Sequence, residues 1–253
     1  MPLLRFLAAA LFAALFIVPQ AASAQSFTDA QRSEIQKIIK DYLLANPEVL
    51  EEVSAELTKR QQAAETAKAA AGVKKHADTL FNSPRGVIVG GRDGDVNFVE
   101  FFDYNCGFCK KAMADMIDLM KDDPKLRVTL KEFPVLGQGS VEAAQVAVAV
   151  RMQDQSGKKY LDFHQKLLTS RGQIDKAKAM AAAKDAGLDM ARLERDIASP
   201  EVKATLEENF KIAEDMGLNG TPSYVIGDLV VVGAIGADAL KEKIAAARRT
   251  AER

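Results

Sequence analysis

Residues 96–109 read VNFVEFFDYNCGFC, and this stretch joins two different patterns. Its first half, residues 96–102, is an almost unbroken apolar run, which is typical of a strand buried on both faces of a sheet. Its second half holds a C-x-x-C pair, Cys106 and Cys109, and a helical pattern continues over residues 110–120. We therefore expect Cys106 to lie where a strand ends and a helix begins.

A second strand is predicted over residues 126–133, LRVTLKEF, because Pro124 ends the helical run before it. Two strands joined by a helix form a β-α-β unit, in which the strands are parallel and the crossover is right-handed. A short strand pattern over residues 87–89 and the turn Asp93-Gly94-Asp95 precede this unit.

Helical patterns dominate residues 139–216, and three glycines are predicted helix stops: Gly157, Gly172 and Gly187. Residues 221–228 then predict a strand and turn, residues 229–232 (LVVV) a hairpin partner, and residues 237–249 a closing helix. The order β-α-β, helical block, β-β-α indicates an α/β protein. It has a thioredoxin-type core with a helical insertion at about 139–216.

The first 24 residues have the pattern of a signal peptide. Arg5 provides a positive start, residues 6–18 are apolar, and Ala22-Ser23-Ala24 is an A-x-A cleavage site. The apolar run is shorter than the roughly 20 residues that span a bilayer. We expect cleavage near Ala24 and an exported mature chain; an uncleaved anchor is the alternative.

Residues 25–75 are predicted to form a helical stalk and linker before a main domain at 76–253. Thr28 with Gln31 matches a capping box, and Asn46-Pro47 interrupts the helical pattern. The apolar stripes are too narrow to make a core alone, so residues 27–60 are expected to join copies of the chain. The alternative is that they fold back on the main domain. Residues 58–75, rich in Ala, Gln and Lys, favour a linker.

The charge balance and the cysteine count limit the classes of function that we expect for this chain. The chain has 34 basic and 35 acidic residues among 253, a net charge of -1, so we expect no nucleic-acid partner. It has only two cysteines, and a disulfide across so short a loop would add little stability. An exported chain that keeps just this pair is expected to use it for chemistry.

The predicted position of Cys106 explains that chemistry. A thiol reacts as its thiolate, and the positive end of a helix lowers the thiol pKa from about 8.5. Cys109, one turn later, can form the disulfide with Cys106 and should be more buried. Half of a zinc site is the main alternative, but only His76 and His164 remain as histidine ligands. Binding of Cu(I) by the two sulfurs is a secondary alternative, because soft thiolates suit that ion. Otherwise we expect no cofactor beyond the redox-active disulfide.

Residues 99–110 resemble the DsbA-like thioredoxin-fold oxidoreductases of bacterial envelopes, and Gly220-Thr221-Pro222 resembles the cis-proline loop of that family. The helical N-terminal extension and Lys131-Glu132-Phe133-Pro134 are most similar to its ScsC (suppressor of copper sensitivity protein C) branch. The resemblance implies a periplasmic location and a homotrimer.

The resemblance also implies roles for six residues. Pro222 would be cis, where the alternative is an ordinary strand-edge proline. Substrate would contact four residues around the thiols: Thr221, Pro222, Gly107 and Phe108. Glu100 and Lys131 would form a buried charged pair beneath the thiols that transfers protons; the alternative is that both point to solvent.

One position departs from the family pattern. Strongly oxidising members carry a histidine where this chain has Phe108, and Phe108 cannot donate a hydrogen bond to the thiolate. C-G-F-C is instead similar to the C-G-Y-C of the disulfide isomerase DsbC. We therefore expect an isomerase or reductase that acts on misoxidised exported proteins and is kept reduced by a membrane thiol reductant. The alternatives are a dithiol oxidase and a copper-binding carrier.

Overall fold

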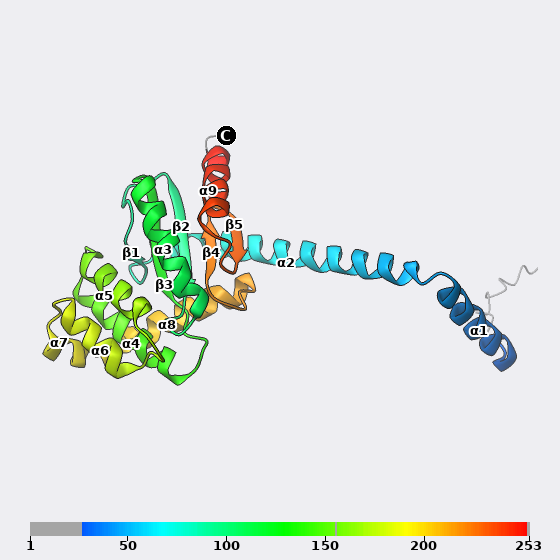
Figure 1. Ribbon diagram of the computed structural model, residues 1–253, viewed down its shortest axis with the longest axis horizontal. Coiled ribbons are helices and arrows are strands. Elements are labelled where there is room, and N and C mark those ends of the chain that lie inside the picture. The colour runs from blue at the N-terminus through cyan, green and yellow to red at the C-terminus, as the bar shows by residue number, and fades with distance from the viewer. Residues whose placement is uncertain (1–26, 155, 252–253) are drawn as a thin grey trace, which may run out of the picture. The chain divides into compact units, whose positions relative to one another are not determined.

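The computed structural model describes residues 27–154 and 156–251 (Figure 1). The predicted signal peptide, with its cleavage site near Ala24, lies outside the described residues. The chain forms two compact units, one up to Leu57 and one from Thr58, and each is described by itself. Among the helices within the described ranges, none combines the length and apolar character needed to cross a membrane.

The first unit contains α1 (Asp29–Ala45) and the start of α2 (Glu48–Asn82). The predicted capping box is confirmed: the Gln31 N–H donates to Thr28 Oγ1 at 3.3 Å, and the Thr28 N–H donates to Gln31 Oε1 at 2.9 Å. Helix α1 ends before Asn46, as predicted. Most of the large apolar side chains described in this unit are exposed: Phe27, Ile35, Ile38, Ile39, Tyr42, Leu44, Leu50, Val53 and Leu57.

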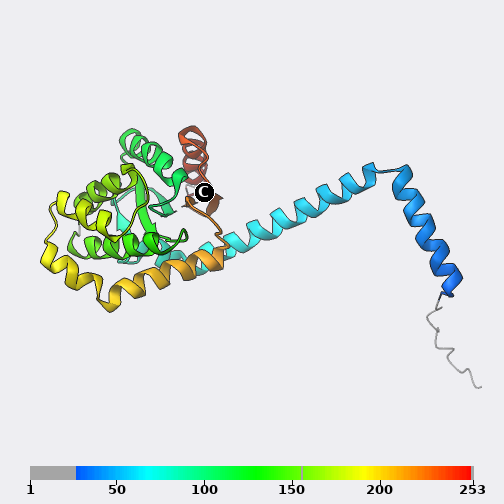
Figure 2. The ribbon, with the colours of Figure 1, turned by 60° about the horizontal axis from the view of Figure 1, so that its bottom comes forward.

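Helix α2 continues without a break through residues 58–75, where the sequence favoured a linker. The Ala, Gln, Glu and Lys residues of this tract are strong helix formers, so it is helical even without an apolar stripe. Its last turns pack beside α8 (Figure 2). Gly72 permits the approach, because a Cβ added there would lie 2.9 Å from the Asp215 carbonyl oxygen. The boundary predicted at residue 75 therefore falls inside a helix.

A five-stranded sheet forms the centre of the second unit, in the order β1-β3-β2-β4-β5. The strands are β1 (Val87–Ile88), β2 (Val96–Phe102), β3 (Leu126–Glu132), β4 (Ser223–Ile226) and β5 (Leu229–Val232). Strands β2 and β3 are parallel, and the other neighbours are antiparallel. Both the β-α-β unit and the β4–β5 hairpin are confirmed.

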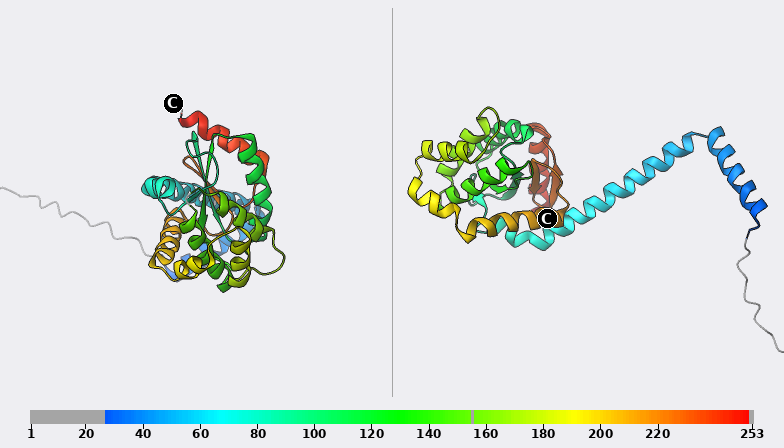
Figure 3. Two further views of the ribbon diagram at one scale, coloured as in Figure 1. Left: turned by 90° about the vertical axis from the view of Figure 1, so that its left-hand side faces the viewer. Right: turned by 90° about the horizontal axis from the view of Figure 1, so that it is seen from below.

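Alternating side chains of β2 point to two different layers of helices. Phe98 and Phe102 face α3 (Gly107–Asp122) and α9 (Ala237–Ala251). Val99 and Phe101 face α8 and the end of α2. Figure 3 shows the sheet between these two layers. We call the first side the thiol face, because both cysteines pack there, and the second side the α8 face.

The helical insertion leaves the sheet after β3 and returns to it at β4. Its helices are α4 (Gln138–Gln153), α5 (Lys158–Thr169), α6 (Lys176–Asp185), α7 (Met190–Ile197) and α8 (Pro200–Met216). Gly217 ends α8 with a left-handed φ of 73°, a conformation that glycine adopts without strain.

A buried polar cluster joins the insertion to the sheet. The hydroxyls of Tyr160 and Tyr104 both donate to Glu132 Oε1 at the end of β3. His164 Nδ1 lies 3.2 Å from the Tyr104 hydroxyl oxygen. Burial raises the pKa of Glu132 well above its usual range. These groups satisfy one another, as buried polar groups must, and fix α5 against the core.

Candidate active site

Cys106 occupies the cap position of α3, as its place between strand and helix predicted. Its N–H donates to the Asp103 carbonyl oxygen at 3.1 Å, and its Sγ accepts the Cys109 N–H at 3.4 Å. A side chain at this position meets the unpaired N–H groups and the positive end of the helix dipole. The sulfur is therefore placed where an anion is stabilised.

The two thiols have opposite pKa shifts. A hydrogen bond from the Cys109 side chain, assisted by Thr221 and by the N–H groups of Cys109 and Phe108, lowers the pKa of Cys106 to about 5 against the opposing effect of burial. The same bond to Cys106, together with burial and the nearby charge of Glu100, raises the pKa of Cys109. Cys109 is completely buried. At neutral pH this arrangement gives one nucleophilic thiolate and one thiol that retains its proton.

The loop before β4 lies against Cys106. The Thr221–Pro222 peptide bond is cis, as the family resemblance implied. The Cys106 Sγ is 3.1 Å from the Thr221 carbonyl oxygen, to which the protonated thiol donates. The Pro222 carbonyl oxygen accepts the Gly233 N–H at 2.8 Å, which ties the loop to the end of β5. Thr221 and Pro222 are therefore brought to the thiols from a distant part of the sequence.

Gly107 and Phe108 lie in the first turn of α3, beside Cys106. Phe108 is 62% exposed, and the Lys111 Nζ lies 5.9 Å from its ring centroid. A Cβ added to Gly107 would have no neighbour within 4 Å. Both residues thus border open space next to the nucleophile, where a substrate can reach them.

Glu100 and Lys131 are both buried, but they lie on opposite faces of the sheet. The parallel register aligns Glu100 with Leu130, whereas Lys131 is aligned with Phe101. Because side chains alternate along a strand, this one-residue offset separates the two charges. Glu100 faces the thiols, and burial, then the charges of Cys106 and Asp115, raise its pKa to about 8. The charged pair expected beneath the active site is therefore not formed.

Comparison with known proteins agrees with this geometry. Residues 98–245, more than half of the chain, match the DSBA-like thioredoxin domain. The chain belongs to the DSBA-like thioredoxin domain family. Residues 31–64 also match the N-terminal domain of the copper resistance protein ScsC. The resemblance to DsbA-like proteins and to ScsC, and the thioredoxin-type fold class inferred from the sequence, are both confirmed.

Three solved structures illustrate the relationship. A thioredoxin-like oxidoreductase from Silicibacter pomeroyi DSS-3 is 40% identical, with a TM-score of 0.64 over 68% of this chain and 97% of its own. ScsC from Proteus mirabilis, in a transitional conformation, is 27% identical, with a TM-score of 0.64 over 90% of this chain and 100% of its own. The thiol-disulfide exchange protein alpha-DsbA2 from Wolbachia pipientis is 27% identical, with a TM-score of 0.66 over 72% of this chain and 97% of its own.

The curated relatives are much longer proteins. The Na(+)/H(+) antiporter NhaA 1 of Salinispora arenicola is 24% identical over 165 residues, which are 63% of this chain and 24% of the antiporter. The chain thus spans about a quarter of the length of the curated relatives it matches.

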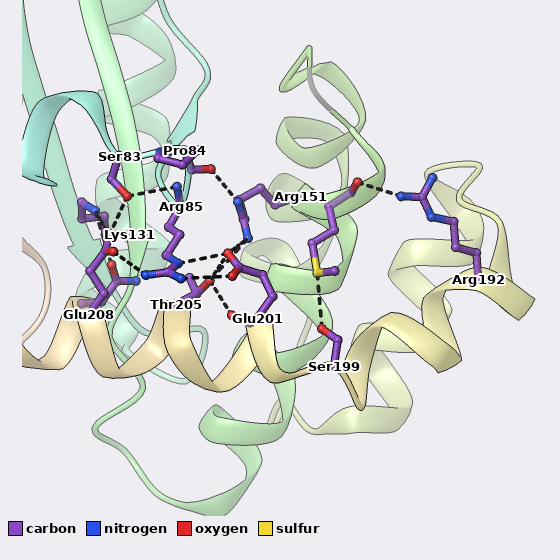
Figure 4. A network of polar contacts seen from close by, with 12 residues as sticks. Ser83, Pro84, Arg85, Lys131, Arg151, Arg192, Ser199, Glu201, Thr205 and Glu208 are labelled. Carbon is purple, nitrogen blue, oxygen red and sulfur yellow. Dashed lines mark hydrogen bonds and ion pairs between the residues drawn. The ribbon is translucent and has the colours of Figure 1, made fainter.

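In the DSBA-like domain, Lys131 belongs to a charge network on the α8 face (Figure 4). Its Nζ lies 3.7 Å from Glu208 Oε1 and 3.4 Å from Asn209 Oδ1. Glu208 also accepts hydrogen bonds from Ser83 Oγ at 2.7 Å and Arg85 Nη1 at 2.9 Å. Burial lowers the pKa of Lys131 to about 8. This lysine is part of a structural network rather than of the thiol site.

A second polar network, which no sequence pattern indicated, holds the loop before Cys106. Asp103 Oδ1 accepts the Asn105 N–H and the Ser140 hydroxyl, both at 2.7 Å. Asp103 Oδ2 accepts the N–H groups of Val135 and Leu136 at 2.8 and 2.9 Å. One buried carboxylate therefore joins the residues before Cys106 to an exposed apolar loop and to α4. Three of its four partners are more than thirty residues away, so no local pattern reveals it.

The structure separates both histidines from the thiols. His76 Nε2 contacts Asp215 of α8 at 2.7 Å, and His164 contacts Tyr104. Within the described residues, no three His, Cys, Asp or Glu side chains gather in a way that could hold a metal ion. The sulfurs of Cys106 and Cys109 are soft donors of the kind that Cu(I) prefers, and the two side chains are hydrogen-bonded to each other.

Proposed function

We propose that this chain is a thiol–disulfide oxidoreductase in which Cys106 is the nucleophile and Cys109 the resolving thiol. The observation that carries the proposal is the asymmetry of the pair: one sulfur caps a helix, and the other is buried behind it and holds its proton. Membership of the DSBA-like family and the cis-proline loop beside Cys106 support it.

The reaction proceeds by two sulfur exchanges. The Cys106 thiolate attacks one sulfur of a client disulfide, the client S–S bond breaks, and the released client thiolate takes a proton from solvent. A client thiol can then displace Cys106, which leaves a rearranged client disulfide and a reduced enzyme. Alternatively Cys109 gives up its proton and attacks the Cys106 sulfur. The client leaves reduced, and the enzyme holds the Cys106–Cys109 disulfide after a two-electron oxidation.

The direct test uses single-thiol variants. Cys109→Ser should accumulate a mixed disulfide between Cys106 and a client such as scrambled ribonuclease, which mass spectrometry detects. Cys106→Ser, the matched control, should form none and should not restore ribonuclease activity. An equal yield of mixed disulfide from both variants would contradict the assigned roles.

We further propose isomerase or reductase activity on misoxidised exported proteins rather than oxidase activity. Phe108 cannot support the thiolate as a histidine does, which favours a less oxidising disulfide. A Cys106 pKa of about 5 lies between a near-neutral thiol and the roughly 3.5 of DsbA, so the reduction potential decides. A potential near -180 mV fits an isomerase, and one near -120 mV fits an oxidase.

The proposal also includes where the protein acts, what keeps its thiols reduced and how its copies assemble. The mature protein acts in the periplasm after cleavage near Ala24, and a membrane thiol reductant keeps its cysteines reduced. Residues 27–60 join copies of the chain, as a trimer by resemblance to ScsC, and present several Cys106 sites to one client. The exposed apolar side chains of α1 and early α2 support this. Replacing Ile38 and Leu50 with Asp should lower the solution mass to that of a monomer, whereas Lys37→Asp should not.

A copper-binding role is the second candidate, because residues 31–64 match the copper resistance protein ScsC and two thiols lie together. Titration of the reduced protein with Cu(I) tests it. Tight one-to-one binding that is lost in Cys109→Ser would support the role. Absence of binding by the wild-type protein would exclude it.

A further inference from the structure

The absence of Lys131 from the thiol face leaves a question about Glu100. In the described part of the chain, the ionisable groups that interact with its carboxyl are all acids. The charges of Cys106 and Asp115 raise the pKa of Glu100. The charge of Glu100 in turn raises the pKa of Cys109 and of Tyr224. On β3 its neighbour is Leu130, and α9 contributes the apolar Leu240 and Ile244 to this face. A buried carboxylate in such surroundings needs a hydrogen-bond donor.

Tyr224 is placed to be that donor. The antiparallel register pairs it directly with Glu100, and both side chains face α3. Direct partners on one face of an antiparallel sheet have Cβ atoms about 4.5–5.5 Å apart. The ring is packed 5.3 Å from that of Phe98, centroid to centroid, so its direction is fixed.

The hydroxyl of Tyr224 is otherwise unexplained. The residue is 1% exposed, and its hydroxyl oxygen has no hydrogen-bond partner among the described residues. Buried hydroxyls are almost always bonded, because leaving one without a partner costs about 1–3 kcal/mol. The other buried tyrosines, Tyr104 and Tyr160, both donate to Glu132. Tyr224 alone among the three directs an unpartnered donor toward the region of Glu100 and Cys109.

We propose that Tyr224 is a positioning residue for the resolving step: through one bridging water its hydroxyl hydrogen-bonds the Glu100 carboxylate, which takes the proton of Cys109. The inference rests on the proposed function and adds to it the residue that replaces Lys131 beside Glu100. A water bridge suits a donor that lies near an acceptor but beyond direct hydrogen-bond distance.

The step can be written with its protons. The Cys109 S–H bond breaks as the proton passes to the Glu100 carboxylate. The Cys109 sulfur bonds to the Cys106 sulfur, the bond from Cys106 to the client sulfur breaks, and the client leaves as a thiolate that takes a proton from Glu100 or solvent. The hydroxyl of Tyr224 donates to the ionised carboxylate, so it favours the form of Glu100 that accepts the proton.

The charges agree with this role. Burial and the charge of Glu100 raise the pKa of Tyr224, so the phenol is a neutral donor at physiological pH. The pKa of Glu100 is about 8. This value reflects burial and the charges of Cys106 and Asp115. A hydrogen bond donated to the carboxylate opposes that rise, so losing the donor should raise the pKa of Glu100 by about one unit.

The test is the pH profile of the resolving step in the full-length protein. The Cys106–glutathione mixed disulfide is formed at low pH, the pH is raised, and glutathione release is followed by acid quench and mass spectrometry. Tyr224→Phe should raise the midpoint of the profile by about one pH unit and slow release at pH 7 roughly tenfold. In a Glu100→Gln background the same change should have no further effect, because it acts through Glu100.

Tyr160→Phe is the matched control, because it removes a buried tyrosine hydroxyl that is bonded to Glu132; it should lower stability and leave the midpoint unchanged. If Tyr224→Phe leaves the midpoint of the glutathione-release profile unchanged while Cys106 is alkylated as fast as in the wild type, the role of Tyr224 is overturned and the proposed function is not. Slow alkylation of wild-type Cys106 would instead overturn the proposed function. Phe fits the volume of Tyr, and an unaltered thermal unfolding midpoint would show that Tyr224→Phe retains the fold.

Discussion

The two faces of the central sheet both bury charged groups, but they treat them in opposite ways. On the α8 face, Lys131 contacts Glu208, which also accepts hydrogen bonds from Ser83 and Arg85. On the thiol face, Glu100 lies among acids, and its pKa is raised to about 8. A buried charge that keeps its partner avoids the large cost of an unpaired buried charge, whereas an isolated one is available for proton transfer.

Burial alone therefore does not identify a functional charge. Glu100 and Lys131 are both almost inaccessible and lie one register position apart on adjacent strands. What separates their roles is the side of the sheet and the neighbours found there. Variants on the two faces should therefore respond differently to pH, to thiol exchange and to denaturant.

The largest effect concerns stability against pH. Because the pKa of Glu100 is about 8 in the folded state and near 4.5 when unfolded, the folded state binds more protons between these values, and stability falls as pH rises through them. Glu100→Gln removes this loss. The variant should therefore gain stability over the wild type by up to about 4 kcal/mol between pH 5 and pH 8. Urea unfolding of the reduced proteins measures it.

Cys106→Ser provides the opposite control. The folded-state pKa of Cys106, about 5, lies below the ordinary thiol value of about 8.5, so its ionisation adds stability as pH rises between these values. The serine variant should lose stability relative to the wild type over this range. A difference between Glu100→Gln and the wild type that does not change with pH would contradict the isolated charge.

The resolving step should show the next effect. Glu100→Gln removes the carboxylate proposed to accept the Cys109 proton, and loss of a general base slows a reaction by at least about 100-fold, or roughly 2.7 kcal/mol. Release of glutathione from Cys106 measures it. Lys131→Met, the control from the α8 face, should release glutathione at the wild-type rate. A comparable slowing in both variants would mean that the two faces act together.

On the α8 face the expected effect is on stability alone. Glu208→Gln leaves the Lys131 ammonium buried without its anion, which should cost about 2 kcal/mol at pH 7. Adding Lys131→Met should recover most of that loss, because the unpaired charge is then removed. Denaturant unfolding measures both changes. A shift in the alkylation profile of Cys106 in either variant would refute the separation of the faces.

The smallest effect compares two glycines. Gly72→Ala on the α8 face would bring a Cβ within 2.9 Å of the Asp215 carbonyl oxygen, so we expect a loss of about 1 kcal/mol after the gain in helix propensity. Gly107→Ala on the thiol side meets no atom within 4 Å and should be neutral or slightly stabilising. Thermal unfolding distinguishes them. An equal response at both positions would remove the packing argument for α2.

Much of this fold could be predicted from the sequence, because its strands are short apolar runs. Strands β2 and β5 have the predicted bounds, and β3 differs by one residue. The place of Cys106 also followed from local order, since a helix cap depends only on adjacent residues. These features need no knowledge of distant contacts.

Features that depend on distant contacts were harder to predict. Which face Lys131 takes depends on the register between β2 and β3, and a shift of one residue would have placed it beside Glu100. The bonds of Asp103 reach residues more than thirty positions away. The continuous helix through residues 58–75 reflects helix propensity, which an apolar pattern does not report.

The reactivity assigned to the thiol pair depends most directly on ionisation of Cys106 at the start of α3. The rate of iodoacetamide labelling of the reduced wild-type protein, with Cys106 identified by peptide mass spectrometry, measures its pKa. We predict a labelling profile with a midpoint of about pH 5. A midpoint near that of an ordinary thiol, about 8.5, would contradict the account.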